Sequence, residues 1–270
     1  MKQSVRESAI RTFEIVRAVG RVTFLEIIRD KVLYNIAVIS FLLLGAGILA
    51  SRLAILKQDR VILDFGLTAL TLSCMLVAVL CGAGMLGREF DRRTVYVALS
   101  RPVSRLQFVA GKFAGLAAVV ALNWLLLAAA YIALLALAAH GGFGQLAGGT
   151  FFCALFLVLA QALMAGALAV FFSSFTTTSL AVVFTAGVWI IGSNVSQLRW
   201  LAVKTGGGLG GALDVLALMI PNFEYFNLGL KVTYGVPVTW LYMTASLAYA
   251  VFVVLLAVLL AGMLARGKEG

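Results

Sequence analysis

Residues 87–112 read GREFDRRTVYVALSRPVSRLQFVAGK and form a strongly basic segment between two long apolar runs. The segment carries six Lys or Arg residues and only two acids, Glu89 and Asp91. Basic loops stay on the cytoplasmic side of a membrane, because moving Lys and Arg across is costly and anionic headgroups attract them. The segment therefore predicts a cytoplasmic loop between two membrane helices, and this loop sets the orientation of the chain.

Within this segment the residue pattern predicts a helix, a sharp turn and a second helix. Apolar residues recur at helical spacing over 90–98, so a helix there has one apolar face among charged neighbours. Pro102 disfavours the α conformation of the residue before it, so this helix should end near residues 99–100. Ser104 and Gln107 have the spacing of a capping box, which predicts the start of the next helix.

The composition is that of a membrane protein. The chain has 270 residues, of which 63% are hydrophobic and 12% charged, whereas soluble domains carry about 25% charged residues. The net charge of +10 comes from basic residues clustered at the ends of apolar runs, which indicates orientation and anionic lipid rather than nucleic acid. No fixed repeat or second soluble region is evident, so residues 1–270 are expected to form a single transmembrane domain.

The apolar runs predict an all-α membrane protein with six transmembrane helices. A helix needs about 20 apolar residues to cross a hydrocarbon core of about 30 Å. Of the 21 Lys and Arg residues, 15 lie in the N-terminal segment, the 87–112 loop and the C-terminal tail, which places both termini in the cytoplasm. The six runs are residues 33–51, 65–86, 113–139, 149–172, 179–197 and 238–265.

Two segments outside these runs have structure of their own. Residues 1–31 have charged residues and apolar residues at helical spacing, which predicts an amphipathic helix in the cytoplasmic interface; a plain basic flank is the alternative. Residues 198–237 contain a Gly-rich stretch and an apolar piece, 212–220, that is too short to cross a membrane. Because non-helical backbone at membrane depth must be satisfied by protein or water, we expect a half-buried hairpin or re-entrant helix pair on the outer face.

The sequence contains no recognisable catalytic, cofactor or metal site. Gly111-Lys112 lacks both the earlier Gly and the following Ser or Thr of a phosphate-binding loop, so any energy must come from a partner chain. His140 is the only His, which argues against His-based zinc sites and Ser-His-Asp catalysis. The three cysteines lie inside apolar runs, where small packing residues are the expected role: Cys74, Cys81 and Cys153. We therefore predict that the chain is not itself an enzyme.

Four uncharged polar residues fall within the predicted spans. Amides in membrane helices commonly join neighbouring helices by hydrogen bonds, although intramembrane polar groups can also serve function. The spans have no deep charged residue, which disfavours an ion or proton relay and favours an amphipathic or lipid-like cargo, or a pathway at a dimer interface. The four residues are Asn123, Gln161, Asn194 and Gln197.

Three stretches resemble one family. Glu89, Thr94, LSRPVSR at 99–105 and Gly-Lys-Phe at 111–113 resemble the loop between the second and third membrane helices of ABC-2 type transporter permeases. The likeness is nearest to the branch with the membrane subunits of copper and nitrous-oxide-reductase maturation exporters and of gliding-motility transporters. Members usually have Gly before the Thr, where this chain has Arg93.

The resemblance implies that the 87–112 loop forms a coupling helix that docks into a separate ATP-hydrolysing subunit. Phe90 and Val97 would then enter a groove on the ATPase, while Glu89 and a neighbouring Arg would set the register by ion pairs. A solvated basic loop that touches lipid is the alternative. The expected docking residues are Glu89, Phe90, Arg92, Arg93, Val97 and Arg101.

The other two stretches resemble structural parts of the same permeases. TFLEIIRDKVLY at 23–34 resembles an elbow helix before the first span, and PNFEYFN at 221–227 resembles a motif of the outer re-entrant region. The elbow residues are Glu26, Arg29 and Asp30; the expected extracytoplasmic gate residues are Pro221, Asn222, Phe223, Phe226 and Asn227.

The function that the resemblance implies is that of a permease subunit of an ATP-binding cassette exporter in a bacterial or archaeal inner membrane. It would work as a homodimer, or paired with a related permease, with two copies of a separate ATPase that binds ATP and magnesium. A non-transporting membrane scaffold or energy transducer coupled to an ATPase is the alternative. The cargo cannot be read from these residues.

Overall fold

The structure is a computed structural model that describes residues 2–53, 58–91, 104–138 and 148–264. This part of the chain is helical and contains no strand, as the all-α prediction requires. The helices are α1 (Lys2–Ile28), α2 (Lys31–Leu53), α3 (Gln58–Asp91), α5 (Arg105–Ala138), α7 (Gly149–Ser173), α8 (Thr178–Gly192), α9 (Val195–Thr205), α10 (Gly207–Met219), the 3-10 turn η1 (Glu224–Phe226), α11 (Gly229–Thr233) and α12 (Trp240–Leu264).

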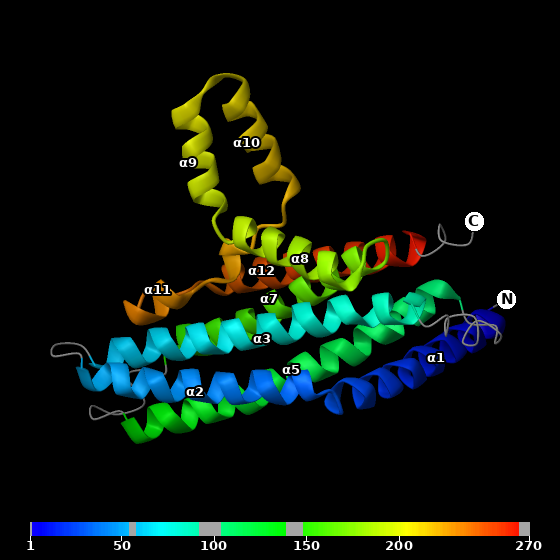
Figure 1. Cartoon of the computed structure of the whole chain (residues 1–270), viewed down its shortest axis with the longest axis horizontal. Helices are drawn as coiled ribbons and strands as arrows, with labels where there is room; N and C mark the ends of the chain where they lie inside the picture. Colours follow the sequence, from blue (N-terminus) through cyan, green and yellow to red (C-terminus); the bar gives the residue numbers. More distant parts are fainter. Residues whose placement is uncertain (1, 54–57, 92–103, 139–147, 265–270) are drawn as a thin grey trace.

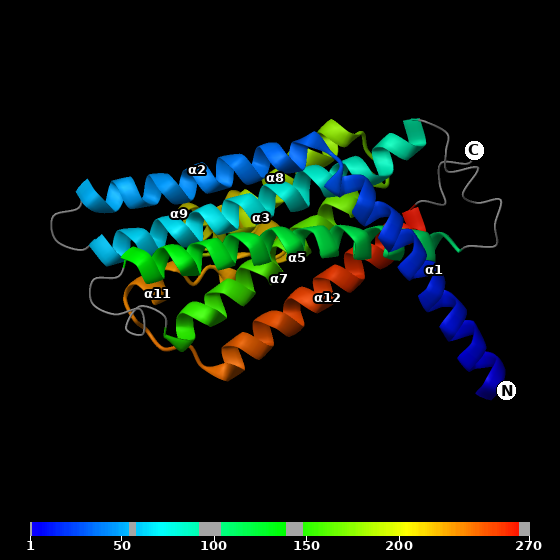
Figure 2. The ribbon, with the colours of Figure 1, turned by 90° about the horizontal axis from the view of Figure 1, so that it is seen from below.

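The long helices lie lengthwise beside one another in a bundle (Figures 1 and 2). α1 begins and α12 ends at one end of this bundle, and α3 ends and α5 begins there too. The short helix α11 lies at the opposite end (Figure 1). The predicted docking segment therefore joins the bundle at the end where the described chain starts and finishes.

The predicted count of six spans is not confirmed. Four helices of the described residues are long and apolar enough to cross a membrane: Arg60–Met85 within α3, residues 105–137 of α5, α7 and α12. α8 and α9 pass this test only as a pair, and they are bent by 71°. The apolar run described in α2, Ile36–Gly47, is shorter than a membrane crossing.

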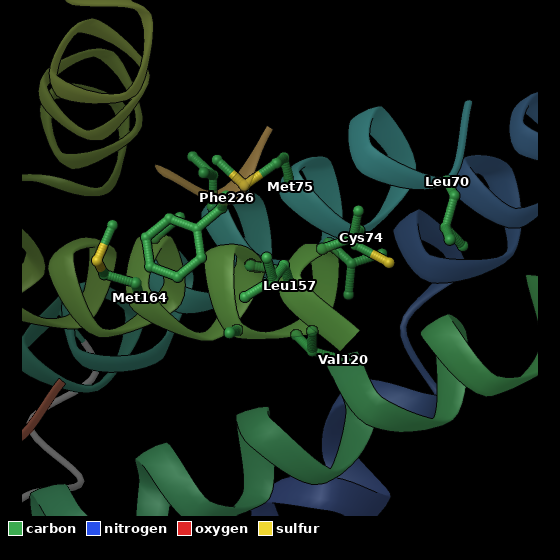
Figure 3. Packing of buried hydrophobic residues seen from close by; sticks show 14 of the residues in the cluster. Leu70, Cys74, Met75, Val120, Leu157, Met164 and Phe226 are labelled. Atoms are coloured by element: carbon green, nitrogen blue, oxygen red, sulfur yellow. The ribbon is translucent and has the colours of Figure 1, made fainter. Parts of the chain in front are cut away.

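The bundle is built around α7, which is buried along nearly its whole length. Figure 3 shows Leu157 and Met164 of this helix among the buried core residues, which also include Met75 of α3. Small residues allow the two helices to approach closely, because a Cβ atom at Gly82 would lie 2.9 Å from the Cβ of Ala169. Small residues at such contacts are typical of helix pairs in membranes.

Two polar contacts join α3 to α5 inside the bundle. Asn123 donates a hydrogen bond from Nδ2 to the hydroxyl of Ser73 at 3.2 Å, and both residues are buried. Tyr131 donates from its hydroxyl to the carbonyl of Leu63 at 2.8 Å. The Tyr131 ring occupies the space beside Gly66, where a Cβ atom would overlap it. These contacts fit the interpretation of Asn123 as a helix-joining residue.

The predicted span 179–197 is interrupted. α8 ends at Gly192, and α9 starts at Val195 after a sharp bend. The carbonyl of Gly192 accepts a hydrogen bond from the backbone N–H of Phe223 at 2.9 Å. A side chain at Gly192 would collide with the carbonyl of Pro221. A distant segment therefore packs against the end of α8, and this contact is not visible in the apolar run itself.

Most of α9 and all of α10 lie in the region 198–237. α9 and α10 are joined at Gly206 and Gly207, whose φ angles of 61° and 60° suit glycine in a tight turn. Figure 1 shows this hairpin projecting away from the bundle. Its re-entrant placement in a membrane stays a prediction.

Candidate functional site

The predicted docking residues fall mostly outside the described structure. α3 continues to Asp91, so Glu89 and Phe90 lie in its last turn, but their side chains are not among the described ones. The helix end predicted near residues 99–100 lies outside the described ranges. So do the remaining four docking residues, which are Arg92, Arg93, Val97 and Arg101. The ATPase-docking face therefore stays a prediction.

The start of the helix after this segment is described, and its predicted capping box is confirmed. The backbone N–H of Ser104 donates to Oε1 of Gln107 at 3.0 Å. In return the backbone N–H of Gln107 donates to the Ser104 hydroxyl at 3.3 Å. α5 begins at Arg105, directly after the cap. The reciprocal bonds satisfy two backbone donors that a helix start otherwise leaves without partners.

α1 is fixed to the first turns of α5. Gln107 donates from Nε2 to the hydroxyl of Thr12 at 2.9 Å. Gly111 and Gly115 then let the two backbones approach, because a Cβ atom at Gly115 would lie 2.7 Å from the carbonyl oxygen of Gly20. Figure 2 shows α1 crossing α5 at this end of the bundle. A force on the start of α5 would therefore also reach α1.

The predicted elbow lies at the junction of α1 and α2. α1 ends at Ile28 and α2 begins at Lys31, so Arg29 and Asp30 form the connection. The backbone N–H of Asp30 donates to the carbonyl of Ile27 at 2.9 Å and closes the last turn of α1. Glu26 and Arg29 are exposed. The chain breaks between the two helices here. The elbow role of these residues and the placement of α1 in a membrane interface stay predictions.

One basic residue of the 87–112 segment is buried in the bundle. Lys112 is only 4% exposed, and its Nζ donates to the carbonyl of Met85 at 3.4 Å. The same Nζ lies 5.5 Å from the centre of the Phe108 ring. Lys112 therefore ties α5 to α3 directly behind the loop.

Residues 221–227, here called the strap, contain the predicted gate residues and pack against the bundle beside the end of α8. Phe223 and Phe226 are buried, and Figure 3 shows the Phe226 side chain among the core residues. The backbone N–H of Asn222 donates to the Tyr249 hydroxyl at 2.9 Å. Asn227 is exposed and accepts a hydrogen bond from the backbone N–H of Gly229 at 3.2 Å. The strap is thus anchored by its aromatic residues.

Glu224 of the strap caps α9. Its carboxylate accepts hydrogen bonds from the backbone N–H of Ser196 at 3.0 Å and from the Ser196 hydroxyl at 2.8 Å. Helix N-termini favour negative charge, because their free N–H groups and the helix dipole are both positive there. Sequence analysis did not single out Glu224, because its partner lies 28 residues away in the chain.

A cavity of about 320 Å³ lies between the strap and helices α3, α7 and α8. The structure here brings Gln161, one of the predicted intramembrane polar residues, close to the predicted gate residues Phe226 and Asn227. The cavity lining also includes residues that the sequence did not point to, among them Trp189 and Ser193 at the C-terminal end of α8. The lining residues are Asp64, Leu67, Thr68, Thr71, Leu72, Ala154, Val158, Gln161, Trp189, Ser193, Phe226, Asn227, Leu228, Gly229 and Leu230.

Comparison with known proteins agrees with this architecture. The family model described as ABC-2 family transporter protein matches residues 7–264, which is nearly the whole chain. No curated protein matches the sequence. The match covers the α1 elbow, the segment between α3 and α5, and the strap together. The chain, a multi-pass membrane protein, belongs to the ABC-2 family of transporter proteins.

Proposed function

We propose that this chain is the permease subunit of an ATP-binding cassette exporter in a cytoplasmic membrane. It moves its substrate with ATP that two copies of a separate subunit hydrolyse with magnesium. The observation that carries the proposal is the family match over residues 7–264, within which the basic segment joins two membrane-length helices. ABC-2 family permeases are typically the non-catalytic membrane subunits of such assemblies. Two permease copies would pair side by side within the membrane.

The contacts of the described residues support a coupling route. An ATPase that pushes the 87–112 segment would act on the end of α3 and on the capped start of α5. Lys112 links these two helices behind the segment, and the Thr12–Gln107 contact passes the push to α1. α3 in turn packs closely on α7 at Gly82. A movement at this end of the bundle would therefore reach its buried centre.

The proposed orientation places this end in the cytoplasm. The basic residues of the sequence gather in the segments that join the bundle there, as membrane topology favours. The strap and the α9–α10 hairpin would then lie on the outer face, and the strap would act as an outer gate held shut by Phe223 and Phe226. α1 would lie in the inner interface as an elbow helix.

Affinity purification from the native membrane tests the docking. We would compare the wild type with Glu89→Arg plus Phe90→Asp, which reverses the charge and removes the apolar anchor at the end of α3. A matched control makes the same kinds of change at exposed residues of α10, Asp214→Arg plus Leu218→Asp. An ATPase should copurify with the wild type and the control but not with the double variant at equal permease level. An ATPase that is absent from all three samples would overturn the proposal.

A further inference from the structure

The cavity beneath the strap is lined by a buried polar side chain, Gln161, that has no partner in the described part of the chain. Gln161 is 4% exposed, and no hydrogen bond joins its amide to another described residue. Nε1 of Trp189 and the hydroxyl of Ser193 also lack a described partner, but they are shielded from the cavity as well as from solvent. A buried polar group without a hydrogen bond costs about 1 to 3 kcal/mol, so the Gln161 amide, which lines the cavity, favours a bound molecule that supplies its missing bonds.

The charge around the cavity favours a cation. Among the described residues that line it, Asp64 is the only charged one, and it is exposed at the rim. The basic side chains of Arg60 on α3 and Lys231 on α11 lie over aromatic rings. Cζ of Arg60 is 5.2 Å from the centre of the Tyr234 ring, and Nζ of Lys231 is 4.2 Å from the centre of the Tyr242 ring. The C-terminal end of α8 also meets the cavity at Ser193, and helix C-termini favour positive charge.

The remaining lining is suited to an apolar stem. Leu67, Leu72, Val158 and Leu228 supply aliphatic surface, and aromatic residues such as Phe226 attract cations to their ring faces. A volume of about 320 Å³ lies at the lower end of the range for small-molecule sites, roughly 300 to 1,000 Å³. The cavity therefore has room for a small ligand with one polar end.

We propose that this cavity binds a small organic cation, namely an amine on a short apolar stem. The amine would donate to the carboxylate of Asp64 and to the amide oxygen of Gln161. The site lies within one copy of the chain and needs no ATPase, so it goes beyond the proposed function and can be tested apart from it.

Fluorine NMR on the purified chain alone tests this site. The protein would be labelled with 5-fluorotryptophan and held in nanodiscs of zwitterionic lipid, which does not concentrate amines at its surface. The chain has four Trp residues, and Trp189→Phe assigns the signal of the cavity. The probes are butylammonium, 1-butanol and butyrate, which share one stem and differ in charge.

Butylammonium should shift the Trp189 signal saturably, with at least tenfold tighter binding than 1-butanol, and butyrate should not bind. Asp64→Asn should weaken butylammonium binding about tenfold or more, because a hydrogen bond to a charged group is lost. Gln161→Leu should also weaken it severalfold. The matched controls Asp214→Asn and Gln197→Leu, which change exposed residues outside the cavity, should leave it unchanged.

Three results would overturn the proposal. Equal binding of butyrate would exclude a cation site, and unchanged affinity in Asp64→Asn would exclude the carboxylate contact. If no probe produces a saturable shift, water alone satisfies the Gln161 amide. Because Asp64 is exposed, its substitution leaves the core intact and keeps the test decisive even if Gln161→Leu fails to fold.

Discussion

Glu224 and Ser196 are joined by two hydrogen bonds, from the Ser196 backbone N–H at 3.0 Å and from its hydroxyl at 2.8 Å, both to one carboxylate oxygen of Glu224. The contact links the strap to the first turn of α9. Because Phe223 of the same strap bonds to the end of α8, the strap holds both sides of the α8–α9 bend. The orientation of the projecting hairpin therefore depends on the strap.

Replacing Glu224 by Gln should loosen the hairpin. The neutral amide accepts weaker hydrogen bonds and loses the favourable interaction with the helix N-terminus, which together cost about 1 kcal/mol. Hydrogen exchange of the amides in residues 195–205 should become faster, while exchange in α7 should stay unchanged. Glu26→Gln, at an exposed position of α1, is the control and should change neither. Unchanged exchange over 195–205 in Glu224→Gln would show that the cap does not hold α9.

Gly192 should tolerate no side chain. A methyl group there would meet the carbonyl of Pro221 and the ring of Phe223, so Gly192→Ala should cost about 1 to 3 kcal/mol through overpacking. Gly187 lies in the same helix with open space around it, and Gly187→Ala should be neutral or slightly stabilising. Thermal unfolding of the two detergent-solubilised variants measures the difference. Equal melting temperatures would contradict the tight contact of the strap with α8.

The crossing of α1 and α5 should be equally sensitive to an added side chain. Gly115→Ala places a methyl group 2.7 Å from both the carbonyl oxygen of Gly20 and the Cβ of Thr23, and backbone cannot move aside easily. We expect a loss of about 1 to 3 kcal/mol and a faster proteolytic release of α1. Gly45→Ala in α2, where nothing lies within 4 Å, is the matched control. A Gly115→Ala protein as stable as this control would argue against close packing of the two helices.

Asn123 and Ser73 should show a measurable coupling. Alanine at either position removes the buried hydrogen bond of 3.2 Å between α5 and α3. A double-mutant cycle of Asn123→Ala and Ser73→Ala should give about 0.6 to 1.7 kcal/mol of interaction free energy, as found for hydrogen bonds between membrane helices. Additive effects of the two substitutions would show that the pair contributes nothing beyond its separate contacts.

Local signals in the sequence predicted the local features of the fold. The spacing of Ser104 and Gln107 predicted the capping box, because both halves of that motif lie within four residues. Composition predicted helices and a membrane. In each case the physical cause lies within a short stretch of chain.

Features that depend on distant partners were not predictable in this way. The interruption of the 179–197 run depends on Phe223 meeting Gly192, and nothing within the run requires it. Gln161 was recognisable as an intramembrane polar residue, but Trp189 resembles any aromatic residue of a membrane helix until the fold places it in the lining of the cavity. The six-span count went further than the structure supports, because apolarity alone does not reveal a bend of 71°.

The measurement that tests the central claim most directly is ATP-dependent labelling of the strap. Asn227→Cys would be introduced into a chain whose three native cysteines are replaced by Ala and reconstituted with its ATPase. An impermeant thiol reagent should label Cys at this exposed position at a rate that changes severalfold with ATP, and Glu89→Arg plus Phe90→Asp should abolish that change. A rate that ATP leaves unchanged, in a complex that does hydrolyse ATP, would contradict coupling between the docking segment and the strap.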